Sequence, residues 1–156
     1  MPTIRPLDPD SPQAQGLIGL SDAFLASLYP PASNHLETLE ALRRPNVCFI
    51  GAWLEDELIG CGAAKTLQDE CGLYGELKRV FVIEAQRGHG YSRQIMAHLE
   101  EYLRRAGVAW ARLETGIRQP AALGLYRALG YRERGPFGAY RLDPYSVFME
   151  KRLATG

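Results

Sequence analysis

The chain has 156 residues, which is the usual size of a single domain that can bury a substantial core. Hydrophobic residues make up 46% of it and charged residues 23%, the balance of an ordinary soluble globular protein. The 18 lysines and arginines equal the 18 aspartates and glutamates, so the net charge favours binding neither to nucleic acid nor to an anionic membrane. We therefore expect one domain over residues 1–156 with neither of these partners.

The N-terminus and the cysteines limit the location and the chemistry. Residues 1–12 are rich in proline and acidic, unlike a signal peptide, and no apolar stretch approaches the ~20 residues of a membrane span. The cysteines Cys48, Cys61 and Cys71 have no zinc-ligand spacing, and no histidine is close to them in sequence. We expect a cytoplasmic protein with reduced structural thiols and no metal.

The pattern opens with a strand and two helices. Residues 3–7 are predicted to form a strand, which Pro6 confines to a sheet edge or a strand end. Ser21 is predicted to cap the first helix, which runs to residue 28 with leucines and Phe24 on one face. Two prolines then stop this helix, and a second helix continues until Pro45.

Three strands, a helix, a strand, a helix and two closing strands are expected next. Their ranges are 47–54, 58–67, 73–83, 91–106, 108–115, 120–129, 131–135 and 146–153, with a hairpin turn at 55–57 and an irregular stretch at 68–72. The helix over 91–106 has an amphipathic stripe, and Gly107 ends it. The whole pattern predicts an α/β (α+β) domain built around one mixed central sheet.

The segment QRGHGYSR, residues 86–93, joins an apolar strand to this long helix. Gly88 and Gly90 lack a Cβ, so an anion could approach the first N–H groups of the helix, which have no partner within it. Hydrogen bonds to a charged phosphate are worth ~1.5–3 kcal/mol each and should outweigh the helix dipole, at ~0.3–1 kcal/mol. Arg87 adds a positive charge. Taken alone, the segment also fits a simple flexible turn.

Two familiar nucleotide-binding loops fit this segment poorly. A P-loop ends in Gly-Lys-Ser/Thr, which is absent here. A dinucleotide fingerprint requires a third glycine close behind the strand, but Arg93 occupies that position and residues 84–87 separate the strand from the first glycine.

The segment resembles the Arg-Gly-x-Gly-x-Gly/Ala signature with which the GNAT family of N-acetyltransferases binds the pyrophosphate of acyl-CoA. The resemblance continues through GELKRVFV before the loop, LETGIRQPAALGLYRALGY after it and the closing PFGAYRLDPYSVFMEKRL, and so spans nearly the whole chain. Two positions depart from the family pattern: Ser92 replaces Gly or Ala, and Gln119 replaces an asparagine that contacts the coenzyme in many members. The resemblance implies a GNAT-like, mostly antiparallel sheet of about six or seven strands with about four helices.

The same resemblance implies acetyl-CoA as a cosubstrate and direct transfer of an acetyl group, in a ternary complex, to a primary amine of a small molecule or peptide. The backbone of residues 80–82 would hold the acetyl and pantetheine parts, and the amides of residues 87–92 the pyrophosphate. The residues implied in coenzyme binding are Val80, Phe81, Val82, Arg87, Gly88, His89, Gly90, Tyr91, Ser92, Gln119 and Tyr126.

Tyr126 occupies the position of the family's usual general acid, although its spacing also fits a core aromatic residue. Glu76 lies where many relatives carry a glutamate that acts as a base through water, and Glu114 is the second candidate. Either glutamate could instead form an ion pair with Lys78 or Arg79.

The acceptor site is expected between the first helices and the closing strands. Its candidate residues are Tyr29, Asn34, His35, Arg79, Glu114 and Tyr140. A homodimer is compatible with the resemblance. A different class of function, a non-catalytic acyl-CoA-binding sensor, also fits the glycine loop.

Overall fold

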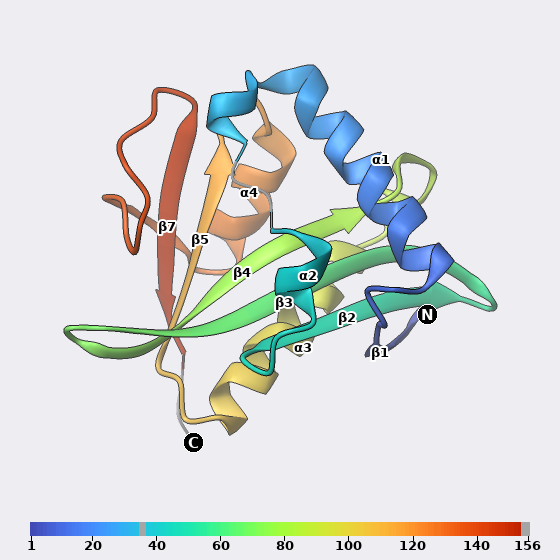
Figure 1. Cartoon of the computed structure of the whole chain (residues 1–156), viewed down its shortest axis with the longest axis horizontal. Coiled ribbons are helices and arrows are strands. Elements are labelled where there is room, and N and C mark those ends of the chain that lie inside the picture. The colour runs from blue at the N-terminus through green and yellow to red at the C-terminus, as the bar shows by residue number, and fades with distance from the viewer. Residues whose placement is uncertain (35–36, 154–156) are drawn as a thin grey trace.

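The structure is a computed structural model that describes residues 1–34 and 37–153. Its elements follow the predicted order: a strand, two helices, three strands, a helix, a strand, a helix and two strands (Figure 1). Their bounds are β1 (Thr3–Pro6), α1 (Pro12–Leu28), α2 (Leu39–Leu42), β2 (Val47–Leu54), β3 (Glu57–Asp69), β4 (Gly72–Val82), α3 (Tyr91–Arg105), β5 (Trp110–Gly116), α4 (Pro120–Ala128), β6 (Arg132–Arg134) and β7 (Ser146–Arg152). Two short 3₁₀ turns, η1 (Pro31–Ser33) and η2 (Glu84–Gln86), complete the described part.

The described strands form one seven-stranded sheet in the order β1-β2-β3-β4-β5-β7-β6. Every neighbouring pair is antiparallel except β4 and β5, which are parallel. This arrangement confirms the predicted mixed, mostly antiparallel sheet with four helices. It also confirms that the strand containing Pro6 lies at a sheet edge, where the absent N–H of proline costs no ladder hydrogen bond.

The parallel pair β4 and β5 holds together over only three residue pairs, from Gly75 opposite Ala111 to Leu77 opposite Leu113. Beyond these pairs the two strands diverge, and in Figure 1 they leave a common start in different directions. The sheet is therefore open at its centre.

Successive residues of a strand point to opposite faces of the sheet, and here both faces carry apolar side chains. The helices therefore cover both faces. On one face, Ile50, Ile59 and Ala64 pack with Ile95 and Leu99 of α3. On the other face, a second core joins α1 and α2 to the sheet through Leu17, Leu42, Phe49, Trp53 and Cys61. Figure 1 shows α1 and α3 on opposite sides of the sheet. No helix of the described residues is long and apolar enough to cross a membrane.

Two of the predicted local features are wrong. The first helix begins at Pro12, where Ser11 accepts a hydrogen bond from the Ala14 N–H at 3.2 Å, so Ser21 is no cap but a buried residue in mid-helix. The prolines and acids before residue 12 suggested a loop, and two glycines within the helix hid its period. The stretch 68–72 is no irregular segment but a tight hairpin, in which the Asp69 side chain accepts from the Cys71 N–H at 2.8 Å.

Candidate active site

A β-bulge redirects the second half of β4 toward the open centre of the sheet. The pairing of β3 with β4 shifts between Cys61 and Ala63, and Arg79 on the opposite strand has a φ of 58°. A positive φ is uncommon outside glycine, and a bulge bends its strand at the extra residue. Beyond the bulge, Val80 and Phe81 line a cavity of about 120 Å³.

This cavity lies where β4 and β5 diverge, and α1, α4 and the segments before α2 and β7 close it. Its aromatic lining residues are Phe24, Tyr29, Phe81, Tyr126, Tyr140 and Tyr145, and its charged lining residues are Glu37, Lys78, Arg79 and Glu114. Aromatic rings and placed polar groups that converge on one hollow are a usual feature of a small-molecule site. Cysteine is absent from the described residues that line it.

The glycine loop follows β4 and opens α3. Gly88 and Gly90 have φ values of 84° and 79°, in the left-handed region where glycine carries no steric penalty, and nothing lies within 4 Å of a Cβ built on either one. The Arg87 side chain turns back from the loop: its Nε donates to the Val82 carbonyl at 3.0 Å, and its guanidinium lies 4.9 Å from the Phe24 ring centre. Arg87 therefore fastens the loop to the end of β4.

The predicted row of pyrophosphate-binding amides, which we call the amide cradle, begins with one that is already bonded within the protein. The Arg87 N–H donates to the Glu84 carbonyl at 3.2 Å and is occupied by the turn η2. The next backbone bond along the loop runs from the Gln94 N–H to the Gly90 carbonyl. The row of donors available to an anion is therefore that of residues 88–93, which includes the predicted His89, Tyr91 and Ser92. Such a row at a helix start fits a pyrophosphate group.

Tyr126 lies on α4 with its side chain in the cavity wall. Burial, together with the negative charge of Glu114, raises the pKa of the Tyr126 phenol to about 12. The phenol is therefore neutral at ordinary pH and keeps a proton that it can donate in a hydrogen bond.

Glu114 projects from β5 into the same cavity. Its Oε2 accepts a hydrogen bond from the Ser146 hydroxyl at 2.8 Å. Burial is the main cause that raises the pKa of the Glu114 carboxyl to about 7. The charges of Glu76 and Asp143 act in the same direction, whereas the Ser146 hydrogen bond and the charge of Lys78 oppose it. A carboxyl that titrates near neutral pH is suited to proton transfer.

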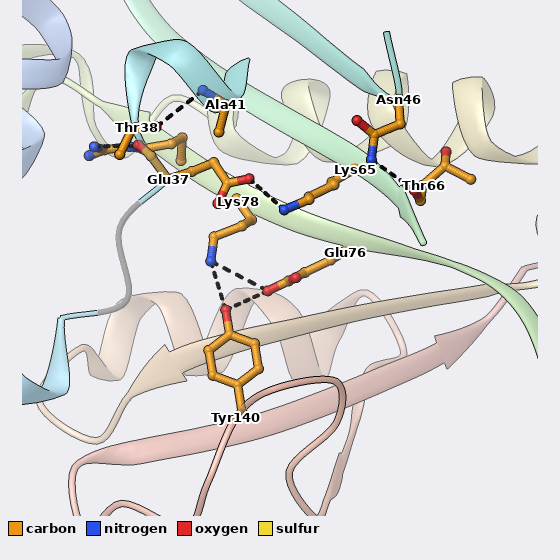
Figure 2. Close-up of polar contacts among 10 residues, drawn as sticks. Glu37, Thr38, Ala41, Asn46, Lys65, Thr66, Glu76, Lys78 and Tyr140 are labelled. Atoms are coloured by element: carbon orange, nitrogen blue, oxygen red, sulfur yellow. Dashed lines mark hydrogen bonds and ion pairs between the residues drawn. The ribbon is translucent and has the colours of Figure 1, made fainter. Parts of the chain in front are cut away.

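Glu76 and Tyr140, both predicted site residues, belong to one hydrogen-bonded group with Lys78 (Figure 2). Tyr140 donates its hydroxyl proton to Glu76 Oε2, and Lys78 Nζ donates to the Tyr140 oxygen at 2.7 Å. Lys78 Nζ also lies 3.4 Å from Glu76 Oε2, so the predicted alternative, an ion pair with Lys78, is present. Burial and the charge of Glu76 raise the pKa of Tyr140. Tyr140 and Lys78 are among the described residues that line the cavity, whereas Glu76 is not.

Arg79, a predicted acceptor residue, has its guanidinium engaged within the protein. Its Nε and Nη2 donate to the Glu37 carbonyl at 3.0 and 2.8 Å, and its Nη1 pairs with Asp22 of α1. The side chain is only 5% exposed. Arg79 thus connects α1 and the segment before α2 to the bulge of β4.

Tyr29 lies under the start of α4. Its hydroxyl donates to Gln119 Oε1 at 3.1 Å and accepts from the Arg118 N–H at 3.0 Å. The predicted coenzyme residue Gln119 therefore uses its carbonyl oxygen within the protein, in line with its departure from the family's asparagine. Gly116 makes this packing possible, because a Cβ there would lie 1.8 Å from the Tyr29 oxygen.

The cavity thus brings together most of the predicted acyl, acid and acceptor residues. They are Tyr29, Asn34, Arg79, Val80, Phe81, Glu114, Gln119, Tyr126 and Tyr140. His35 lies outside the described residues. Sequence reasoning missed Glu37, Tyr145 and Ser146, which approach the cavity from segments far apart in the chain, and no local pattern marks them.

Comparison with known proteins agrees with this geometry. The acetyltransferase (GNAT) family matches residues 17–131. The chain is 43% identical over 137 residues to the IAA acetyltransferase of Azospirillum brasilense, a match that covers 88% of each protein. It is 39% identical over 127 residues to the uncharacterized N-acetyltransferase YsnE of Bacillus subtilis, covering 80% of this chain and 82% of the relative.

Solved structures show the same fold. A protein from Klebsiella pneumoniae, described as an acyl-CoA N-acyltransferase, superposes over 99% of both chains with a TM-score of 0.80 and 34% identity. An aminoglycoside 6'-N-acetyltransferase in complex with coenzyme A superposes over 97% of both chains with a TM-score of 0.72, at 20% identity.

The split sheet and these matches identify an acyl-CoA-dependent N-acetyltransferase, which uses acetyl-CoA as cosubstrate and acts on an amine. The chain belongs to the GNAT family of acetyltransferases.

Proposed function

We propose that this enzyme transfers the acetyl group directly to a primary amine of a small molecule, within one ternary complex. The observation that supports this most strongly is the cavity beside the split of the sheet, with Glu114 and Tyr126 in its wall and no cysteine among its described lining residues. Cys61 is fully buried elsewhere, and burial raises the pKa of its thiol to about 12, which makes it a poor nucleophile. An acyl-enzyme on cysteine is therefore disfavoured.

The amides of residues 88–92 are our candidates for holding the pyrophosphate, and the strand Val80–Val82 for holding the acyl end. Acetyl-CoA supplies the activated acetyl group. The protein contributes the position of the two substrates, which can provide ~7–11 kcal/mol of the barrier reduction, and a water-excluded cavity.

Glu114 is the stronger candidate for the base that removes a proton from the acceptor ammonium. It faces the cavity, and its carboxyl titrates near neutral pH. Glu76 was the first choice from sequence, but its carboxylate is held by Tyr140 and Lys78. We assign Glu76 the role of fixing these two side chains beside the acceptor.

Tyr126 is our candidate for the group that assists the leaving thiolate. A phenol with a pKa of about 12 does not give up its proton completely to a thiolate whose conjugate acid has a pKa of about 8.5. It instead stabilises the developing negative charge by a hydrogen bond, which is a form of electrostatic catalysis.

The test is the release of free thiol from acetyl-CoA in the presence of a panel of primary amines. We expect release with at least one small amine, and a loss of release in both Glu114→Gln and Tyr126→Phe. A thermal-shift titration with acetyl-CoA serves as the control for binding. If acetyl-CoA binds but no amine releases thiol, the protein is the non-catalytic sensor.

We also propose a cytoplasmic location, which the free thiols of Cys48, Cys61 and Cys71 support because reducing compartments keep cysteines unpaired. A homodimer stays a prediction, and sedimentation velocity would measure the oligomeric state directly.

A further inference from the structure

The acceptor side of the cavity is an aromatic wall. We use this name for Phe24, Tyr29, Tyr140 and Tyr145, which come from α1, the residue after it and the segment before β7. The Tyr29 and Tyr145 rings meet edge to face with their centres 6.1 Å apart. Aromatic faces attract flat apolar groups and also ammonium ions.

Both basic side chains in the cavity lining already have acidic partners. Arg79 pairs with Asp22 and donates its other guanidinium N–H groups to the Glu37 carbonyl. Lys78 pairs with Glu76 (Figure 2). Glu37, the second carboxylate in the lining, is itself paired with Lys65 at 3.1 Å. A carboxylate on the acceptor would have to displace one of these acids.

Glu114 is the carboxylate of the lining that lacks an ion pair among the described residues. The groups that face it are Glu76 and Lys78 from β4, Tyr140 and Asp143 from the segment before β7, Ser146 from β7, Tyr126 from α4, and Tyr29. When Glu114 ionises, the cavity gains a negative charge that no neighbouring cation pairs with at ion-pair distance. An ammonium group on the acceptor supplies that missing partner.

On the basis of the proposed transfer to an amine, we propose that the acceptor is a small monoamine with an aromatic body and no carboxylate next to the amine: an arylalkylamine rather than an amino acid. The ammonium lies beside Glu114, and the ring packs on the aromatic wall. An α-carboxylate would be held within a few Å of Glu114, where like charges repel and where both basic side chains of the described lining, Lys78 and Arg79, are already engaged. The cavity of about 120 Å³ is of a size that suits a small acceptor.

Matched acceptor pairs test this directly: phenethylamine against phenylalanine, and tryptamine against tryptophan. Each pair differs only in the α-carboxylate. We expect kcat/KM for the amine to exceed that for the amino acid by at least ~100-fold, the size that a like-charge contact of several kcal/mol produces. Phenylalanine methyl ester, which hides the carboxylate charge, should recover most of the lost rate.

Two variants connect the preference to Glu114. Glu114→Gln should lower the rate for every acceptor and also shrink the ratio between amine and amino acid. Ser146→Ala removes a hydrogen bond that lowers the Glu114 pKa, so it is compared at a pH well above that pKa, where Glu114 stays ionised and the ratio should be preserved. Circular dichroism confirms that both variants fold.

The outcomes are distinct. Amino acids used as well as their decarboxylated partners would overturn the proposed acceptor class and leave the N-acetyltransferase function intact, as would a preference for the polyamine spermidine over the arylalkylamines. Thiol release from no amine at all, with acetyl-CoA still bound, would overturn the proposed function and the acceptor class together.

Discussion

Glu114 shows how one half-buried carboxyl can set the working pH of an enzyme. A base must be ionised to accept a proton, and the Glu114 pKa is about 7. We expect kcat/KM to rise with pH up to about 7 and then to level, until the acceptor amine itself titrates. Glu114→Gln should lose the inflection near 7 but keep the one from the acceptor. An unchanged profile in this variant would remove Glu114 from the proton transfer.

The ionised form of Glu114 lowers the stability of the folded protein. The ordinary pKa of a glutamate is 4.5, and in the folded protein that of Glu114 is about 7. Between these values the folded state binds more protons than the unfolded state, so the stability falls as the pH rises through this window. We expect Glu114→Gln to be more stable than the wild type at pH 8, by ~1–3 kcal/mol, with little difference at pH 5. Urea denaturation at both pH values measures this.

Tyr126 and Tyr131 form a matched pair of buried tyrosines, with ring centres 6.0 Å apart. Tyr126 lines the cavity, whereas the Tyr131 hydroxyl donates to Glu100 at 2.8 Å. Tyr126→Phe should lower kcat by ~10- to 1,000-fold and leave acetyl-CoA affinity nearly unchanged. Tyr131→Phe should lower the stability and spare kcat. Equal kcat values for the two variants would reduce Tyr126 to a packing residue.

At the scale of an element, the start of helix α4 depends on one glycine of β5. A side chain at Gly116 would collide with Tyr29, whose hydroxyl holds Arg118 and Gln119. We expect Gly116→Ala to lower the free energy of unfolding by ~1–3 kcal/mol and to reduce activity. Gly124→Ala is the control, because that glycine lies within α4 with open space around it, and alanine there should be neutral or stabilising by up to ~1 kcal/mol.

Helix α3 has glycines with left-handed φ at both ends, which allows loop strain to be separated from coenzyme binding. Gly88 and Gly107 have φ values of 84° and 77°, and neither has an atom within 4 Å of its Cβ position. Alanine at either site should cost ~1 kcal/mol of stability. Only Gly88→Ala should also weaken acetyl-CoA binding, by at least ~10-fold in Kd measured by calorimetry. Equal affinities in the two variants would count against the amide cradle.

Element prediction succeeded where the signal is local and failed where it is not. The strand over residues 47–54 is a continuous apolar run and the helix from Tyr91 has a clear period, and the structure reproduces both. The beginning of α1 was missed because Gly16 and Gly19 weaken its pattern. Prediction of the site residues succeeded and failed for the same reason. The glycine loop and Tyr126 each lie within a short continuous motif, whereas Arg79 pairs with Asp22 at a separation of 57 residues.

At the scale of the whole molecule, the split between β4 and β5 could be expected only through the resemblance to a known family. Residue periodicity predicts strands but not which strands pair or where pairing stops. Periodicity also does not reveal that Glu76 is hydrogen-bonded to Tyr140 while Glu114 faces the cavity. The two glutamates lie on strands whose apolar and polar residues alternate in the same way. The choice between these two bases is a property of the assembled sheet.

Arg79 links α1, which contributes to the acceptor side of the cavity, to the strand that is proposed to hold the acyl group. A single guanidinium fastens α1, through Asp22, and the segment before α2, through the Glu37 carbonyl, to the bulge that aims the acyl strand. A substitution on α1 made to accommodate another acceptor will therefore shift the strand that receives the donor. The segment before β7 is also tied to β4, because Tyr140 is bonded to Glu76 and Lys78. Acceptor preference should be more easily altered at Tyr145, whose ring packs on Tyr29 rather than on this strand, than on the helix.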